Sequence, residues 1–527
     1  MFLTKLSFSK KLLAISLLTV LSGGLAACKD NKNEKTETVT EPTAKNVIFF
    51  LGDGMGITTL TASRIYSVGE EGDLTIDTLP ETAFVRTFSE DGQVTDSAPS
   101  MAAYMTGVKM KNEVISMQTG TIASPPTAEG TSTCDDVAEN KNKKPVETLL
   151  ELAKAQGMGT GIVTTTRVTH ATPATTYAHV CHRDAENDIA AQLVPGGKGS
   201  GWGAYNAKLK DGVDVVLGGG LRQFKPTAAN GGKRADGRDL VKEMQDQGYS
   251  FVSKGSDLAK IDPAKTKKLL GLFNVSHMNY DLDRINKKID EPSLADMTTK
   301  AIDILQAKNK SFFLMVEGGR IDHALHDTNA KRALQDTVAL DDAIKAAIDK
   351  VKQTDPELKN TLIVVTADHD HTMILNGYAK RTGKYVKGSE TSVLGLVKDD
   401  SSSGYARDEN GTPYPIISFG TGKKRLDNNR IEARGALTDS DICNPVAGPA
   451  GKYIDSRGTD LTQAGWCTGT AADDFQQEAV IQTGFNDSET HGGTDVFLGA
   501  VGAGSDNFYG SLENIEVFGL IRKAIGL

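Results

Sequence analysis

The residues with the clearest chemical potential are carboxylates and histidines spaced as metal ligands. Asp322 and His326 are four residues apart, a spacing that puts two side chains on one face of a helix. Asp368 and His369 are adjacent, and His491 precedes two glycines. Oxygen and nitrogen donors without thiolates suit Zn²⁺ in an open, catalytic site. A single Asp and His at this spacing is usually a solvated surface pair, but several such groups in one chain favour a metal site.

Ser97 is the candidate nucleophile. It lies in the segment Thr95–Tyr104 (TDSAPSMAAY), which is typical of a loop entering a helix. The first turn of a helix offers backbone N–H groups to a phosphate. A serine hydroxyl needs a base or a metal to activate it, and the segment lacks the Gly-x-Ser-x-Gly turn of a triad hydrolase. The alternative is that Asp96 or Ser97 only caps the helix.

Short apolar runs provide the framework that would position these groups. Helical patterns over residues 145–157, 327–352 and 513–525 alternate with runs typical of buried strands. These strand-like runs are Asn46–Leu51, Gly161–Thr164, Val213–Leu217, Phe312–Val316, Leu362–Thr366 and Val496–Ala500. The alternation predicts an α/β fold with a large, mostly parallel central sheet and helices on both faces.

Ionisable residues follow three of the predicted strands. Asp53 comes just after the first, Glu317 directly after the fourth, and Asp368 with His369 just after the fifth. The carboxyl ends of parallel strands share one edge, so we expect these side chains to meet there rather than to cap separate strand ends. From about residue 377 to 482, Gly, Ser, Asp and Asn dominate, which indicates an inserted, irregular, crown-like lobe over the site.

The N-terminal segment is predicted to be a targeting signal rather than part of the folded domain. Residues 1–27 have a basic start and an apolar run too short to span a bilayer, as in a signal peptide. The following Cys28 resembles the acylated cysteine of bacterial lipoproteins, and residues 28–45 resemble a flexible tether leading to a domain over 46–527. Lys29 after the cysteine implies the outer membrane, with the domain facing the periplasm or the exterior. An ordinary signal peptide with a chance cysteine is the alternative.

The remaining cysteines are even in number. Cys134, Cys181, Cys443 and Cys467 allow three disulfide pairings, of which Cys134–Cys181 with Cys443–Cys467 closes the shorter loops and is preferred. A zinc site made of the four thiolates would need a Cys-x-x-Cys spacing that the chain lacks. The overall charge of −9 argues against nucleic acid as a partner.

Six segments in order resemble those of alkaline phosphatases. They are Asn46–Gly56 (NVIFFLGDGMG), Thr95–Gly107 (TDSAPSMAAYMTG), Thr164–Arg183 (TTTRVTHATPATTYAHVCHR), Glu317–His326 (EGGRIDHALH), Val365–His371 (VTADHDH) and Glu489–Gly493 (ETHGG). The resemblance covers nearly the whole mature chain apart from the tether and the predicted lobe. It implies hydrolysis of phosphate monoesters through a covalent phosphoserine, with release of inorganic phosphate.

The resemblance also implies two zinc ions and one magnesium-like ion. One zinc would be held by Asp322, His326 and His491. The other would be held by Asp53, Asp368 and His369, with Ser97 completing the set. The third ion would take Asp53, Thr172 and Glu317. Arg183 would grip the phosphate, and Asp96 would orient Arg183.

Two positions depart from the best-known bacterial pattern. His170 and His323 stand where that pattern has Asp and Lys, and in this they resemble the animal enzymes. His170 should lie close to the third ion, directly or through water, which leaves the identity and occupancy of that ion open.

Two other functions fit the same residues less well. A related hydrolase acting on phosphodiesters or sulfate esters would usually carry Thr or a modified Cys at position 97, where this chain has Ser97. A non-catalytic metal- or phosphate-binding lipoprotein would be expected to lack a ligand, and none is missing. The expected partners are small phosphomonoesters, the membrane through a lipid anchor and, as in the family, a second copy of the chain.

Overall fold

The computed structural model describes residues 44–229, 231–308, 310–389, 391–398, 404–408, 413–422, 471–483 and 488–527. The predicted signal peptide, Cys28 and almost all of the tether lie outside these residues, as do Cys443 and Cys467. Within them, no helix is both long enough and apolar enough to cross a membrane.

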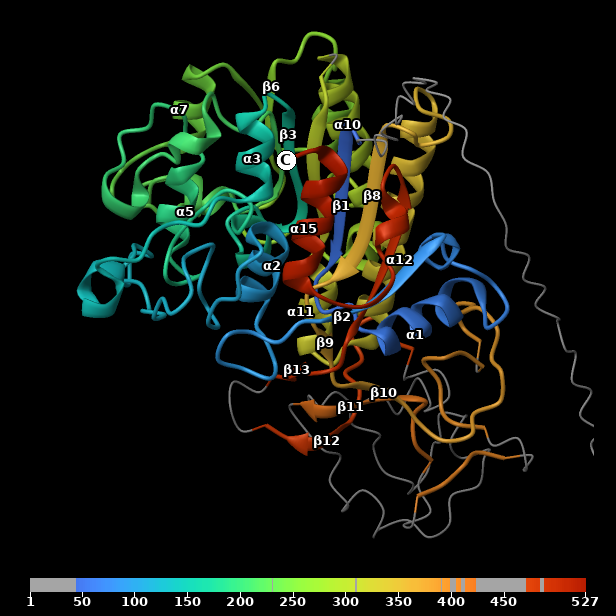
Figure 1. Ribbon diagram of the computed structural model, residues 1–527. Coiled ribbons are helices and arrows are strands. Elements are labelled where there is room, and N and C mark those ends of the chain that lie inside the picture. The colour runs from blue at the N-terminus through green and yellow to red at the C-terminus, as the bar shows by residue number, and fades with distance from the viewer. Residues whose placement is uncertain are drawn as a thin grey trace, which may run out of the picture. The chain divides into compact units, whose positions relative to one another are not determined.

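A ten-stranded sheet forms the centre of the fold (Figure 1). Its order is β15-β2-β14-β8-β1-β7-β3-β4-β6-β5. In chain order the strands are β1 Asn46–Gly52, β2 Glu81–Arg86, β3 Gly159–Arg167, β4 Val215–Gly219, β5 Tyr249–Val252, β6 Lys268–Leu272, β7 Phe312–Gly318, β8 Thr361–Ala367, β14 Val496–Gly502 and β15 Gly510–Glu513. Every neighbouring pair is parallel except the two pairs that include β14. The predicted α/β fold with a mostly parallel sheet is confirmed.

Helices cover both faces of this sheet (Figure 1). One layer contains α1 Ile57–Val68, α9 Asp281–Asn286, α10 Leu294–Ala307, α11 Arg320–His326 and α12 Ala330–Lys352. The other contains α2 Ser97–Thr106, α3 Leu149–Ala155, α4 Ala171–Ala174 and α15 Asn514–Ile525. Short helices α5 Glu186–Gln192, α6 Leu221–Phe224, α7 Leu240–Asp246 and α8 Gly255–Lys260 lie in the connections around β4 and β5.

The central strands are apolar because they are covered on both sides. In β1, the run Val47–Leu51 has no exposed surface, and Phe312–Val316 of β7 is equally buried. β1 pairs in register with β7 on one side and β8 on the other, so Gly52 lies level with Gly318 and Ala367. This register brings the ends of three strands to one line at the edge of the sheet.

Two expected helix starts differ from the structure. The helix expected from Pro145 begins four residues later at Leu149, because Thr148 and Glu151 form a reciprocal capping box. Pro145 instead forms an isolated bridge with Met117. The helix expected from residue 327 begins at Ala330, where Asn329 accepts a hydrogen bond from the backbone N of Arg332.

The described parts of the predicted lobe contain regular structure. A three-stranded sheet is formed by β10 Met373–Leu375, β11 Ile417–Gly422 and β12 Ala479–Gln482, in the order β10-β11-β12. Beside it, β9 Asp370–His371 pairs with β13 His491–Gly492. An ion pair connects α12 to this region, because the ammonium of Lys331 lies 2.7 Å from the Asp473 carboxylate. Of these strands, β11 and β12 lie within the insert predicted at about 377–482, and β10 lies just before it.

Candidate metal and phosphate site

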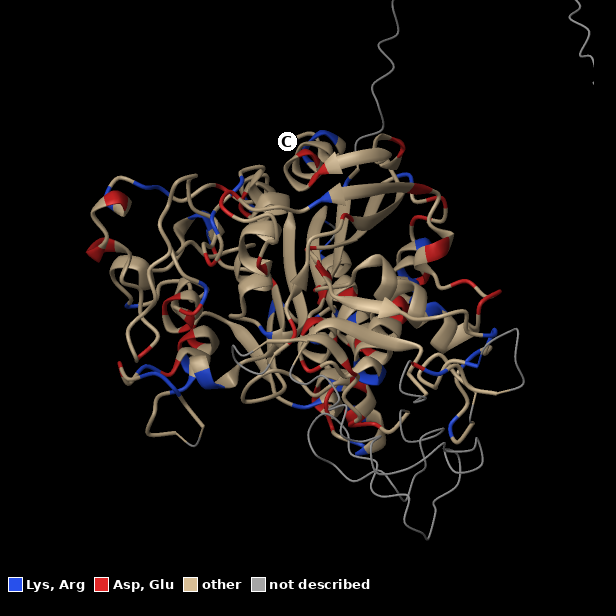
Figure 2. Ribbon diagram, turned by 90° about the horizontal axis from the view of Figure 1, so that it is seen from below, with Lys and Arg blue, Asp and Glu red and all other residues tan. Residues whose placement is uncertain are grey.

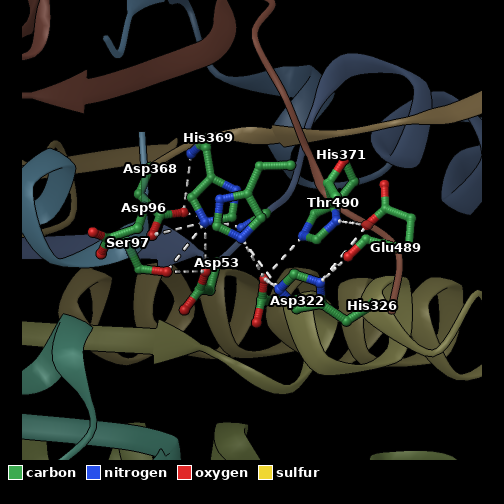
Figure 3. Close-up of polar contacts among 12 residues, drawn as sticks. Asp53, Asp96, Ser97, Asp322, His326, Asp368, His369, His371, Glu489 and Thr490 are labelled. Atoms are coloured by element: carbon green, nitrogen blue, oxygen red, sulfur yellow. Dashed lines mark hydrogen bonds and ion pairs between the residues drawn. The ribbon is translucent and has the colours of Figure 1, made fainter. Parts of the chain in front are cut away.

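The ends of β1, β7 and β8 carry buried acids into one place. Asp53 follows β1, Glu317 is the last residue but one of β7, and Asp368 follows β8. All three are fully buried. Figure 3 shows Asp53 and Asp368 beside His369 and Ser97. The convergence expected from a parallel sheet is confirmed.

Ser97 is the first residue of α2 rather than its cap. The cap is Asp96, whose Oδ1 accepts a hydrogen bond from Ala98 N at 2.7 Å. The Ser97 hydroxyl is left to face the site, with Oγ 3.2 Å from Asp53 Oδ1 and 3.1 Å from His369 Nε2. The alternative in which the serine is only a helix cap is excluded by this geometry.

Asp53, Asp368 and His369 form a first donor set. His369 Nε2 is 3.3 Å from Asp53 Oδ1 and 3.6 Å from Asp368 Oδ2. Burial raises the pKa of Asp368 well above its usual value, and the neighbouring Asp53 carboxylate raises it further. Asp368 Oδ2 is buried and has no hydrogen-bond partner among the described residues. Two carboxylates and an imidazole crowded in a dry site suit a divalent cation, which would supply the missing positive charge.

Asp322, His326 and His491 form a second donor set. Asp322 and His326 share a face of α11, with His326 Nε2 3.2 Å from Asp322 Oδ1. His491 Nε2 lies 3.6 Å from the same oxygen. The other ring nitrogens face backbone carbonyls, since His326 Nδ1 is 2.7 Å from Glu489 O and His491 Nδ1 is 2.8 Å from Thr95 O. Each Nδ1 is placed to donate to its carbonyl, so the neutral form of each ring has its lone pair on Nε2, the nitrogen that faces Asp322 and would serve as the ligand.

The two donor sets are adjacent. The rings of His369 and His491 are stacked with their centroids 3.5 Å apart. Two cations held this close can act on the same phosphoryl group, one at each end of an in-line displacement.

Sequence reasoning missed His371, which supports the second set. His371 Nε2 is 2.9 Å from Asp322 Oδ1, and its Nδ1 contacts the Glu489 carboxylate (Figure 3). Alternation along an extended chain places His369 and His371 on the same side, so the spacing His-x-His after a buried strand was the available signal. The antiparallel bridge between β9 and β13 puts His371 directly opposite His491.

A third group of donors lies on the other side of Asp53. Thr172 Oγ1 donates to Asp53 Oδ2 at 3.2 Å. Glu317 is close to Asp53 and His170, and burial together with Asp53 raises its pKa well above the usual value. Glu317 Oε1 and His170 Nδ1 are both buried, and neither has a hydrogen-bond partner in the part of the chain that the structure describes. These unpaired atoms fit a cation, or the water bound to one.

Arg183 provides a guanidinium at the mouth of the site. Its Nη1 donates to Asp96 Oδ1 at 2.9 Å, and its Nη2 is 3.3 Å from His170 Nε2. Burial opposes the positive charge, but Asp96 and other nearby carboxylates outweigh it and raise the pKa of Arg183 above its usual value. The loop before Arg183 is fixed by the disulfide between Cys134 and Cys181, as predicted. A permanently charged, oriented fork suits two phosphate oxygens.

His323 lies beside His170, which contacts Arg183, but its charge differs from that of a lysine at the same position. Burial and the guanidinium of Arg320 lower the pKa of His323 to about 3, so the ring is neutral at physiological pH. His170, His323 and a further residue that the sequence did not indicate, His277, form a cluster of three imidazoles with ring centroids 4.2–5.3 Å apart. His277 comes from the segment after β6, which no motif marks.

Comparison with known proteins assigns the chain to a family. The alkaline phosphatase family profile matches residues 44–527. The chain belongs to the alkaline phosphatase family. It is 34% identical over 506 residues to a membrane-bound alkaline phosphatase of Bombyx mori, with 90% of this chain and 78% of the relative covered. It is 33% identical to the tissue-nonspecific alkaline phosphatase of Rattus norvegicus, with 89% and 81% covered.

Solved structures of alkaline phosphatases have the same fold. The Thermus thermophilus enzyme superimposes with a TM-score of 0.61 at 23% identity, covering 95% of this chain and 96% of that one. The enzyme of the Antarctic bacterium TAB5 gives a TM-score of 0.56 at 23% identity, covering 92% and 99%. The chain is therefore a metal-dependent phosphatase that hydrolyses phosphate monoesters through a phosphoserine intermediate.

Proposed function

We propose that Ser97 is the residue that carries the phosphoryl group in this alkaline phosphatase. The observation that supports this assignment is the position of Ser97 Oγ, 3.2 Å from Asp53 Oδ1 and 3.1 Å from His369 Nε2 at the first turn of α2. In the first step Oγ bonds to phosphorus, and the bond from phosphorus to the leaving oxygen breaks. In the second step a water oxygen attacks the phosphoserine and releases inorganic phosphate. Two inversions give overall retention at phosphorus.

Two zinc ions are proposed for the two adjacent donor sets. Asp53, Asp368 and His369 would hold one, together with Ser97, and Asp322, His326 and His491 would hold the other. Bound zinc supplies Lewis acidity at the entering and leaving oxygens. The residues themselves orient the site, because the backbone carbonyls of Glu489 and Thr95 fix the imidazoles of His326 and His491.

A magnesium ion is proposed for the third donor group of Asp53, Thr172 and Glu317, next to His170. Hard oxygen donors suit magnesium, and a neighbouring imidazole can hold one of its water ligands. A variant of the TAB5 alkaline phosphatase has been described with magnesium in its third metal site. His323 would border this region as a neutral hydrogen-bonding group.

Arg183 is proposed to bind two oxygens of the phosphoryl group, with Asp96 as its positioning residue. Asp96 holds one guanidinium nitrogen at 2.9 Å and also accepts hydrogen bonds from the backbone N of Ala98 and of Glu113. The same carboxylate therefore fixes the start of α2 and the direction of Arg183. The nucleophile and the phosphate-binding group are thus held at a fixed distance from each other.

Substitution of Ser97 tests the nucleophile. Ser97→Ala should lower turnover of 4-nitrophenyl phosphate by at least about a thousandfold, since no other hydroxyl replaces the attacking oxygen. Mass spectrometry of acid-quenched enzyme should find phosphate on the peptide containing Ser97 only in the unsubstituted protein. Ser63→Ala is the matched control, because Ser63 Oγ is buried without a hydrogen-bond partner in α1. Near-normal turnover by Ser97→Ala would refute the assignment.

Export as a lipoprotein is a further part of the proposal. It rests on the sequence alone: a signal peptide over 1–27, acylation of Cys28, a tether over 28–45 and a phosphatase domain from residue 46. The enzyme would then lie on the outer membrane and act on small phosphomonoesters. It would form a homodimer, in keeping with its family, and a second disulfide would join Cys443 and Cys467. Replacing Cys28 by Ser should move the activity from the membrane fraction to the soluble fraction, and unchanged fractionation would exclude the anchor.

A further inference from the structure

We infer that Ser100 and Tyr104 of α2 are positioning residues for the nucleophile, because they fix α2 to the end of β8 and so set the place of the Ser97 hydroxyl beside the first donor set. The inference rests on the proposed function and adds two residues to it. Both residues are too deeply buried to meet a substrate, since Ser100 is 1% and Tyr104 0% exposed. They act through the backbone that carries the proposed zinc ligands.

Three side chains on one face of α2 contact three consecutive residues at and just after the end of β8. Residues 97, 100 and 104 are three and four positions apart, so they line one side of the helix. Their contacts are the Tyr104 hydroxyl to Ala367 O at 2.9 Å, Ser100 Oγ to Asp368 O at 2.6 Å, and Ser97 Oγ to His369 Nε2 at 3.1 Å. The helix therefore runs along this short stretch of chain with each of the three side chains opposite one of its residues.

The Ser100 hydroxyl links three elements of the fold. Its oxygen accepts a hydrogen bond from Asn514 Nδ2 of α15 at 3.2 Å, and its single proton is donated to Asp368 O. Asp368 and Ala367 have no exposed surface, so a carbonyl that lost its donor would stay unsatisfied. The unfavourable free energy of such a state keeps α2 in a single position at the end of β8.

The covalent chain does not set the distance between the nucleophile and the metal ligands, because Ser100 and Asp368 are 268 positions apart. Asp96 fixes the other side of the site, where it holds Arg183 at 2.9 Å. The contacts of Ser100 and Tyr104 therefore place the nucleophile against the metal ligands, whereas Asp96 places it against the phosphate-binding group. A displacement of about 1 Å in a catalytic site can lower a rate by about 100-fold.

The experiment measures, by rapid quench, how fast 4-nitrophenyl phosphate phosphorylates Ser97. Tyr104→Phe keeps the ring and removes one of the two hydrogen bonds, and Ser100→Ala removes the other. Each change should lower the phosphorylation rate by about tenfold, and the double variant should lower it by about 100-fold. Zinc titration of the chelator-treated variants should give affinities within about twofold of that of the unsubstituted protein, because every donor atom remains.

Thr106→Val is the matched control and should leave the phosphorylation rate unchanged. Thr106 also has a buried hydroxyl in α2, but it donates to Ala102 O within the helix at 2.7 Å. Unchanged rates in Ser100→Ala and Tyr104→Phe, or an equal loss in Thr106→Val, would overturn the inference. A loss of zinc affinity of about tenfold or more would also overturn it, by showing that the two residues support Asp368 as a ligand instead. Failure of the proposed function would look different, since the unsubstituted protein would then form no phosphoserine.

Discussion

Buried acids lie at both ends of the central sheet, but their surroundings differ in charge. At the amino ends of the strands, Asp214 precedes β4 and contacts Lys308 at 2.6 Å and Lys154 at 3.2 Å. Thr160 N donates to the same carboxylate at 2.9 Å. Burial opposes ionisation of Asp214, yet the two lysines hold its pKa below the usual value. This is a neutralised network that stabilises the fold.

At the carboxyl ends, acids face acids. Asp53, Asp368 and Glu317 are all completely buried, and burial and Asp53 raise the pKa of both Asp368 and Glu317 well above their usual values. Figure 2 looks onto this end of the molecule and shows acidic segments in red among the strand ends, with basic and acidic segments interspersed around them. Burial opposes ionisation of Asp53, yet His369 holds its pKa below the usual value. Among the described residues, no lysine or arginine forms an ion pair with Asp53, Asp368 or Glu317.

The paired carboxylate at the amino ends stabilises the fold, whereas the carboxylates at the carboxyl ends are placed to bind metal. Both ends bury carboxylates at comparable depth, so burial by itself distinguishes nothing. The difference is whether the protein supplies the counter-charge, and where it does not, the site selects an external cation. Substitutions that exchange a carboxylate for an amide should therefore have opposite consequences at the two ends.

The largest effect is expected for Asp368→Asn. Removing one ligand of the proposed zinc should lower turnover of 4-nitrophenyl phosphate by about a thousandfold or more. In chelator-treated protein the same change should leave the free energy of unfolding unchanged or raise it, because it relieves repulsion from Asp53. Urea unfolding with and without chelator, together with metal analysis, measures both effects. A destabilised metal-free variant would remove the distinction between the two ends.

Asp214→Asn should show the reverse behaviour. It leaves Lys308 without its carboxylate and leaves Lys154 with only the exposed Asp211, at 2.9 Å, so the free energy of unfolding should fall by about 3 kcal/mol. Turnover per folded molecule should stay the same, because the site lies at the other end of the sheet. The pKa of Asp214 is lowered from 3.8, so its stabilisation is present above about pH 3.8 and is lost as the pH falls toward the lowered value. Unfolding measured from pH 7 down to pH 3 should show this acid-dependent loss only in the unsubstituted protein.

The sequence predicted the site better than it predicted the sheet around it. Asp53, Glu317 and Asp368 could be placed together because parallel strands end at one edge whatever their exact register. The direction of β14 could not be predicted, since Val496–Ala500 is an apolar run like those of the parallel strands and only its neighbours make it antiparallel. The strand β2 was missed because half of its residues are exposed and its pattern is weak.

Contacts between distant segments account for the other omissions. His277 lies 107 positions after His170 in the chain (277 − 170), and only folding brings their rings to 5.2 Å. The start of α3 at Leu149 depended on Thr148, whose hydroxyl donates to Thr176 O at 2.6 Å while accepting from Glu151 N. A favourable first-turn proline at position 145 was outweighed by that cap.

His371→Asn tests whether zinc binding at the carboxyl ends of the strands depends on residues that contact the metal ligands without being ligands themselves. His371 joins Asp322 to Glu489, and such supporting residues typically contribute about 10- to 100-fold to metal affinity. Zinc titration of chelator-treated protein should show a loss of that size at one of two sites. His179→Asn is the matched control, because His179 is also buried and contacts Glu151 at 2.9 Å away from the metal ligands. Equal zinc affinity in both variants would show that Asp322 needs no support.

The smallest expected effect concerns Glu113, which contacts both Asp96 and Arg183 at the carboxyl ends of the strands. Its backbone N donates to Asp96, its backbone O accepts from Arg183 N at 2.8 Å, and burial and Asp96 raise its pKa to about 7. As the pH rises from 6 to 8, Glu113 should ionise and add negative charge beside Arg183, which opposes a phosphate dianion. This partly exposed charge should raise KM by only about two- to threefold. Glu113→Gln should lack this component, whereas Glu147→Gln, which removes an exposed acid paired with Lys208, should retain it. Because the substrate's own ionisation affects all variants equally, the difference between their KM profiles isolates Glu113, and superimposable profiles would place its charge too far from the phosphate to matter.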